Sequence, residues 1–270
     1  MGIEPTNLLH AMQALYQLSY APRRRNEPSS LGPAIGVGAG GSDVPTPRRA
    51  GYSHSVAFNG WPARALEFYE GLEADNSKAY WTDNKAVYER DVHGPMAALV
   101  SELEGEFGEG RLFRPYRDVR FSADKSPYKT AIAAMVGEGY IQLSADGLMA
   151  GAGMYHMAPD QLERYRRAVA SDATGPVIEE IVAALNGAKI DVHGSDSLKT
   201  APKGYPKDHP RIGLLRNKGL VAMKQWKPAA WLGTAAARTR IEELLRGTRP
   251  LTGWLDEHVG PSTLEDRGRR

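Results

Sequence analysis

Apolar residues recur at helical spacing in the segment that follows residue 56. A first helix is predicted to open at Pro62, because proline suits the first turn of a helix. A second is predicted to run to about Val92 from Asn76 or Ser77, either of which can cap its first turn. The same spacing continues over residues 94–107. Three helices are therefore predicted before any strand.

The middle of the chain changes to short apolar segments separated by glycine, proline and aspartate. This arrangement is typical of antiparallel strands joined by tight turns. The predicted strands are 119–122, 130–136, 140–144 and 148–155. Between them, residues 137–139 and 145–147 fit hairpin turns.

Helical spacing returns in the last part of the chain. The predicted helices are 158–170, 176–185, 210–218, about 229–245 and 251–258, with one further strand at 220–225. Asp208 is placed to cap the short helix that starts at Pro210. Helices, then strands, then helices again indicate an α+β fold, with a central antiparallel sheet in a single domain of residues 56–260.

The two ends of the chain differ from this domain in composition. Residues 22–50 contain five prolines and five glycines, and too few large apolar side chains to offset the entropy of ordering them. Residues 1–55 are therefore predicted to form a disordered or poorly ordered extension, in which 6–19 have the spacing of a short helix. A translation start placed upstream of the true domain would explain the same leader. Residues 261–270 are predicted to be a polar tail.

The bulk composition excludes several classes of function. The chain is 41% hydrophobic and 24% charged, as in ordinary soluble domains, and it has no cysteine, which excludes disulfides, thiol catalysis and thiolate metal sites. No apolar run approaches the roughly 20 residues that span a bilayer, and no secretory signal is recognisable. We therefore expect a cytoplasmic protein with no membrane partner.

Positive charge is concentrated in two segments of the domain. The chain has 34 basic and 32 acidic side chains, of which five and three precede residue 51, so the remainder is balanced. Within this neutral remainder, residues 114–129 hold five basic and two acidic side chains, and residues 199–218 hold six and one. Two local excesses of positive charge predict an anionic ligand.

The residue types in these segments suggest roles. The side chains predicted to bind the ligand are Arg117, Arg120, Lys125, Tyr128, Lys129, Lys199, Lys203, Lys207 and Arg211. Arginine is suited to carboxylates and phosphates because its planar guanidinium donates two parallel hydrogen bonds. The predicted acid–base groups are Asp118, Asp124 and His209, since histidine titrates near neutrality. The structural alternative is an ion-pair network that locks a hairpin, with His209 packed at a helix start.

Other catalytic motifs are missing from the sequence. The histidines include no pair at helical i,i+4 spacing, and the chain has no nucleophile elbow and no phosphate-binding loop. We therefore predict no metal site, and the sequence indicates neither a particular cofactor nor an oligomeric state.

The two basic segments also carry a family resemblance. Residues 117–122 and 124–130 resemble one signature of the family named domain of unknown function 2461, and residues 198–216 resemble a second. The likeness covers residues 56–257 in the expected order. The chain departs from the family pattern at Thr200, where an arginine is usual, and at Asp75, where an asparagine is usual. The resemblance implies no established activity.

Two hypotheses about function follow. The first is an enzyme that acts on a phosphorylated or otherwise anionic small molecule in a basic cleft formed by residues 117–130 and 199–211. The second is a non-catalytic module that binds anions or nucleic acid through the same surface. A cleft in which the two segments meet would favour the enzyme.

Overall fold

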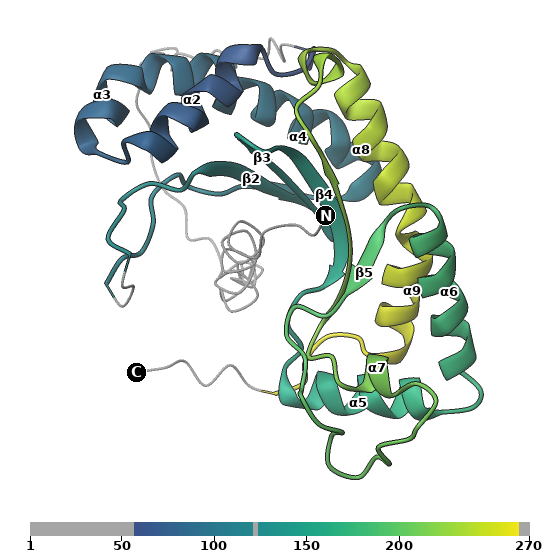
Figure 1. Ribbon diagram of the computed structural model, residues 1–270. Helices are drawn as coiled ribbons and strands as arrows, with labels where there is room; N and C mark the ends of the chain where they lie inside the picture. The colour runs from purple at the N-terminus through teal and green to yellow at the C-terminus, as the bar shows by residue number, and fades with distance from the viewer. Residues whose placement is uncertain (1–56, 121–123, 265–270) are drawn as a thin grey trace, which may run out of the picture.

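A six-stranded antiparallel sheet, with strands in the order β1-β2-β3-β4-β6-β5, organises the chain. The computed structural model describes residues 57–120 and 124–264 (Figure 1). The strands are β1 (Gly110–Leu112), β2 (Ala131–Val136), β3 (Gly139–Ser144), β4 (Gly147–Met154), β5 (Asp191–His193) and β6 (Leu220–Trp226). The helices are α2 (Ala63–Ala74), α3 (Lys78–Val87), α4 (Gly94–Phe107), α5 (Pro159–Ala170), α6 (Gly175–Gly187), α7 (Ile212–Leu215), α8 (Ala236–Gly247) and α9 (Arg249–His258). The α+β prediction is confirmed.

Strands β2, β3 and β4 form a meander joined by the two predicted hairpin turns. Tyr140 pairs with Met135 on one side and with Gly151 on the other, which fixes the register of all three strands. Gly147 starts β4 at φ +106°, and a Cβ there would lie 2.2 Å from the carbonyl oxygen of Trp226. Only glycine fits this close approach of two backbones.

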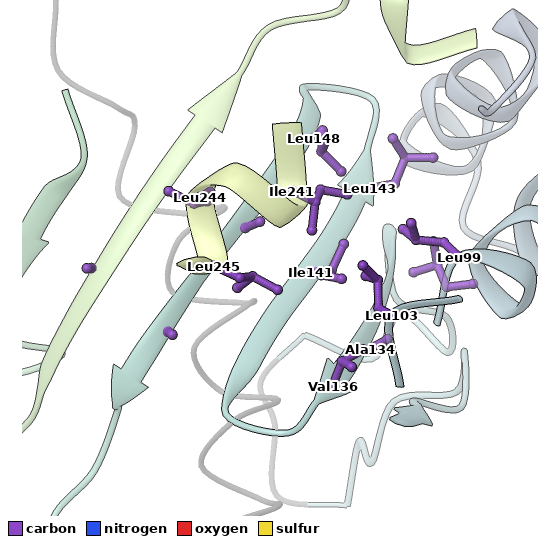
Figure 2. Close-up of a cluster of buried hydrophobic side chains, with 14 of the residues drawn as sticks. Leu99, Leu103, Ala134, Val136, Ile141, Leu143, Leu148, Ile241, Leu244 and Leu245 are labelled. Carbon is purple, nitrogen blue, oxygen red and sulfur yellow. The ribbon is translucent and has the colours of Figure 1, made fainter. Parts of the chain in front are cut away.

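One side of the sheet carries the main hydrophobic core. Figure 1 shows α2, α3, α4, α8, α9 and α6 as an arc around the outer side of the curved sheet. Figure 2 shows leucines and isoleucine of α4 and α8 over the apolar side chains of β2, β3 and β4. The labelled side chains are Leu99, Leu103, Ala134, Val136, Ile141, Leu143, Leu148, Ile241, Leu244 and Leu245. These positions alternate along each strand, so the opposite set of side chains points to the inner side of the arc.

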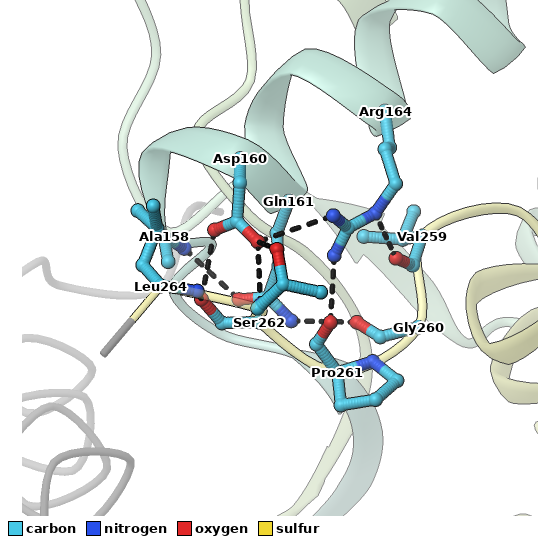
Figure 3. A network of polar contacts seen from close by, with 10 residues as sticks. Ala158, Asp160, Gln161, Arg164, Val259, Gly260, Pro261, Ser262 and Leu264 are labelled. Atoms are coloured by element: carbon cyan, nitrogen blue, oxygen red, sulfur yellow. Dashed lines mark hydrogen bonds and ion pairs between the residues drawn. The ribbon is translucent and has the colours of Figure 1, made fainter. Parts of the chain in front are cut away.

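A network of polar contacts holds the end of the described chain against α5 (Figure 3). Asp160 accepts hydrogen bonds from the hydroxyl of Ser262 and the backbone N–H of Thr263, both at 2.8 Å. Arg164 donates to the carbonyl oxygens of Val259 and Pro261. The first residues of the predicted polar tail are therefore packed on the domain.

The two predicted elements in the basic segments differ from the structure. Residues 119 and 120 are not in a strand, because the chain there has no neighbouring strand and pairs only through the isolated bridge between Tyr116 and Tyr128. The helix predicted over 210–218 is only α7, without a side-chain cap from Asp208. Its backbone turns away to pair with an earlier segment, since the carbonyl oxygen of Arg216 accepts from the N–H of Leu198.

Some predictions fall outside the described residues. These are the extension over 1–55, the short helix over 6–19, the strand residues Phe121 and Ser122, and the tail from 265 onward. No helix in the described part of the chain is both long enough and apolar enough to cross a membrane.

Candidate functional site

The inner side of the sheet carries a second apolar cluster, which we call the inner face. It consists of Phe113, Ala133, Tyr140, Met149, Val221 and Met223, with Met135 and Tyr155 packed against them. None of the described helices contributes a side chain to this cluster. The six central residues are nevertheless only 2% to 8% exposed. In β2 and β4 both alternating sets of side chains are apolar, which is typical of strands buried on two sides.

An extended loop, which we call the arm (residues 113–120 and 124–130), projects from one edge of the inner face. It joins β1 to β2, and Figure 1 shows it reaching away from the sheet below α3. Its two limbs are paired near the base, where the N–H of Lys129 donates to the carbonyl of Pro115 at 2.8 Å and that of Arg117 to Pro127 at 2.9 Å. The arm is therefore a short irregular ribbon.

The turn between α2 and α3 anchors this arm. The side chain of Asn76 donates to the carbonyl oxygen of Tyr128 at 3.1 Å and accepts from its N–H at 3.0 Å. The ring of Tyr128 stacks on that of Trp81, with ring centroids 4.3 Å apart and an angle of 6° between planes. Tyr128, a predicted ligand-binding residue, is thus buried and holds the arm in place.

Two of the predicted cations form ion pairs within the arm. Arg120 binds Asp118 through two hydrogen bonds of 2.9 Å and 2.6 Å, which lower the pKa of that carboxyl group to about 2. Arg117 pairs with Asp124, whose pKa is held far below its usual range by the hydroxyl and N–H of Ser126 and then by Arg117. Carboxylates with such low pKa values are poor proton carriers near neutral pH, so this geometry favours the structural alternative for both pairs.

Two other cations, Lys129 and Arg111, lie over Phe113 at the base of the arm, and Arg114 lies near Lys129. The Nζ of Lys129 lies 5.7 Å and the Cζ of Arg111 lies 5.8 Å from the centre of the Phe113 ring. Arg114 is close enough to repel the Lys129 ammonium. No hydrogen bond or ion pair joins the side chains of these three to another residue of the described chain. Burial, and then this repulsion, lower the pKa of Lys129.

Lys125, the remaining predicted cation of the arm, is exposed. Its Nζ donates to the carbonyl oxygen of Val119 at 3.0 Å. It therefore links the two limbs of the arm.

In the second basic segment, Arg211 is part of the fold. It is 7% exposed and donates to the carbonyl oxygens of Val169, Ala170 and Ser171 at the end of α5. The carbonyls of Val169 and Ala170 belong to the last turn of the helix, where carbonyls have no partner within the helix, so a cationic donor there acts as a C-terminal cap. Asp172 adds an ion pair at 3.2 Å.

The other predicted residues of this segment point to solvent or to their own backbone. Lys199, Lys203 and Lys207 are exposed. The Nδ1 of His209 accepts a hydrogen bond from the N–H of Arg211 at 3.0 Å, which fixes the tight turn ahead of α7. This contact agrees with His209 as a turn residue.

The structure does not bring the two basic segments together. In Figure 1 the arm lies below α3 at one end of the molecule, and residues 199–211 lie beside α5 and α7 at the other. The prediction of one basic cleft built from both is therefore wrong. Sequence spacing could not show this, because the sheet between the segments sets their separation.

Sequence reasoning missed the inner face, Arg111 and Arg114. The signal for the inner face was present in β2 and β4, whose segments have no polar residues; β3 has Gln142 and Ser144 at alternate positions. In the described ranges no group of three histidine, aspartate or glutamate side chains could hold a metal ion.

Comparison with known proteins was informative in one respect. No curated protein and no solved structure matches the chain. A family model described as conserved hypothetical protein (DUF2461) matches residues 64–254, a span that includes the arm, the inner face and the second basic segment. This match confirms the resemblance seen in the sequence: the chain belongs to the DUF2461 family.

Proposed function

We propose that this protein binds a small organic anion that has an apolar body. The anionic group meets Arg111, Arg114 and Lys129 at the base of the arm, and the apolar body lies beside the ring of Phe113. The observation that carries this proposal is the placement of Arg111 and Lys129 at one aromatic ring, with Arg114 near Lys129. Asp118, which is already paired with Arg120, is the carboxylate whose charge also reaches Arg114.

Electrostatics favours this assignment. Like charges placed close together repel, and the repulsion is relieved when an anion binds between them. The ammonium of Lys129 is also partly desolvated, which strengthens its attraction to a bound anion. The aromatic ring of Phe113 between Arg111 and Lys129 favours a ligand with an apolar part over inorganic phosphate.

Replacing Lys129 with methionine is expected to weaken binding of an anionic dye about ten-fold, because a hydrogen bond to a charged group contributes about 1.5 kcal/mol or more. The probe is anilinonaphthalene sulfonate, titrated by fluorescence against the full chain. Phenylnaphthylamine, which has the same aromatic body without the sulfonate, should bind Lys129→Met and wild type equally. Lys85→Met, at an exposed position on α3, is the matched control and should bind both dyes as wild type does.

Three results would contradict the proposal. The first is equal loss of both dyes in Lys129→Met, which would indicate a packing defect and no anion contact. The second is failure of either dye to bind while the chain sediments as a dimer, which would make the inner face an interface between copies. The third is binding that appears only after the residues before 57 are removed by proteolysis, which would make that part of the chain the occupant.

Dye binding is also expected to depend on pH in a specific direction. Only the protonated ammonium attracts the sulfonate, and the pKa of Lys129 in the folded protein is lowered from 10.5. Affinity for anilinonaphthalene sulfonate should therefore fall as the pH rises through this lowered pKa, before an ordinary lysine would lose its proton. A titration of dye affinity against pH checks this, and in Lys129→Met the decline in that range should disappear.

A further inference from the structure

The inner face is buried although none of the described helices packs on it. Its central side chains, among them Tyr140, Met149 and Val221, are only 2% to 8% exposed. Figure 1 shows α2, α3, α4, α8, α9 and α6 on the other side of the sheet. An antiparallel sheet whose second side is uncovered presents that side to water. The burial of the inner face therefore requires a cover from elsewhere.

The parts of the chain outside the described residues include one segment suited to this role. Residues 121–123 are too short to cover a sheet, and 265–270 read Glu-Asp-Arg-Gly-Arg-Arg. Residues 22–50 are rich in proline and glycine, whereas 6–19 are rich in leucine and contain no Asp, Glu, Lys or Arg. The cluster that forms the inner face has no charged member either. An uncharged segment can cover such a face without burying an unpaired charge.

The order of residues within 6–19 gives this segment one apolar side. At helical spacing, one side carries Leu8, Leu9, Met12 and Leu15, and the opposite side carries Asn7, His10, Gln13 and Gln17. An isolated helix of this length is marginal in water, and packing of its apolar side supplies most of its stability in a protein. A segment with this pattern therefore needs an apolar surface to pack on.

The width of the inner face matches the length of this segment. The N–H of Phe113 donates to the carbonyl oxygen of Ala133 at 3.0 Å, so Phe113 extends the sheet beside β2. From there the cluster continues across β3 and β4 to Val221 on β6. Four strand spacings amount to about 19 Å, and a helix over residues 6–19 would be about 21 Å long. One such segment is enough to cover the cluster.

The chain between this segment and the domain is long enough for it to reach the inner face. The described chain begins at Ala57, and the N–H of Phe58 donates to Glu102 of α4 at 2.7 Å, on the outer side of the sheet. Residues 20–56 therefore have to pass one edge of the sheet. A flexible chain of this length spans about 33 Å on average, which exceeds the width of six strands, about 24 Å.

We propose that residues 6–19 of this chain cover the inner face and pack on it through their apolar side. The inner face is then an intramolecular docking surface. The proposal explains its burial without a ligand or a second copy of the chain. It does not depend on the proposed function, because the anion site lies at the base of the arm, at the edge of this cluster.

Cysteine cross-linking of the full chain tests the docking, because the sequence has no cysteine of its own. The test pair is Met12→Cys with Met135→Cys, a partly buried position at the rim of the inner face. The control pair is Met12→Cys with Lys85→Cys, an exposed position on α3. A short bis-maleimide is expected to join the test pair within one chain about ten-fold faster than the control pair, since docking raises the local concentration of the two thiols. Mass spectrometry of tryptic peptides identifies the joined residues.

A second pair of variants measures the exposure of the inner face in the full chain. Leu9→Asp places a charge on the apolar side of the segment and should release it from the inner face. This variant is expected to bind additional anilinonaphthalene sulfonate, which the further change Lys129→Met does not remove. Gln13→Asp adds the same charge on the polar side and should bind the dye as wild type does.

Three results would overturn the docking of residues 6–19. Equal rates of cross-linking in the two pairs would show that the segment is not held on the inner face. Cross-links that join two chains would make a second copy the occupant. Unchanged dye binding by Leu9→Asp would show that the segment does not cover an apolar surface. Each of these leaves the anion site intact, since that site is tested separately by the loss of dye binding in Lys129→Met.

Discussion

Replacing Arg211 with alanine is expected to lower the free energy of unfolding by about 3 kcal/mol, because it removes a buried cation that caps a helix and takes away the side-chain donor of the Val169 and Ala170 carbonyl oxygens. The side chain is 7% exposed and donates to Val169, Ala170 and Ser171. A Cβ at Gly175 would lie 2.4 Å from its Nε, so the guanidinium fills a gap between α5 and α6. Urea denaturation of the variant and wild type measures the difference.

The matched control for this prediction is Arg167→Ala. Arg167 is an exposed arginine on α5, and its removal should change the free energy of unfolding by no more than about 0.5 kcal/mol. Both variants should bind anilinonaphthalene sulfonate as wild type does at a temperature where they are folded. Unchanged stability of Arg211→Ala would contradict the capping role, and lost dye binding by the folded variant would return Arg211 to the ligand site.

Replacing Asn76 with alanine is expected to have the second largest effect, a loss of about 2 kcal/mol of stability together with weaker dye binding. Asn76 makes two hydrogen bonds with the backbone of Tyr128, next to Lys129. Without them the arm loses its attachment to the turn between α2 and α3. Lys129 is then no longer held over Phe113, so affinity for the anionic dye should fall although Asn76 is not part of the proposed site.

Asn84→Ala is the matched control for the anchor. Asn84 donates only to the carbonyl of Tyr80 within its own helix, so its replacement should leave dye affinity unchanged. The loss of stability in Asn76→Ala should be smaller in Asn76→Asp, which keeps an acceptor for the N–H of Tyr128. If Asn76→Ala binds the dye with wild-type affinity, the arm does not need this anchor to position Lys129.

Much of the secondary structure follows from local periodicity, because helical and strand spacing are properties of neighbouring residues. The run from Ala131 to Val136 and the helix from Gly94 to Phe107 occur close to their predicted bounds. Local pattern fails where the partner lies far away in sequence. Residues 119 and 120 have the composition of a strand, but no strand stands beside them to pair with.

The candidate site shows the same limit more strongly. A basic side chain looks alike in sequence whether it is buried under a helix end, as Arg211 is, or placed over an aromatic ring, as Lys129 is. What separates them is the presence of acceptors: Arg211 has carbonyl oxygens in reach, and Lys129 has none among the described residues. That difference depends on where the sheet places α5 and the arm in space. The spacing of residues in the sequence does not predict this placement.

The two strands at the margins of the sheet, β1 and β5, are each three residues long. Short margins with charged side chains, here Arg111 and Asp191, present few free backbone groups in a row and discourage addition of a foreign strand. The molecule is therefore protected against edge-to-edge aggregation of the kind that builds fibrils. A partner protein is expected to contact the side chains of this molecule. It has few free backbone groups to pair with at β1 and β5, so it is not expected to add a strand to the sheet.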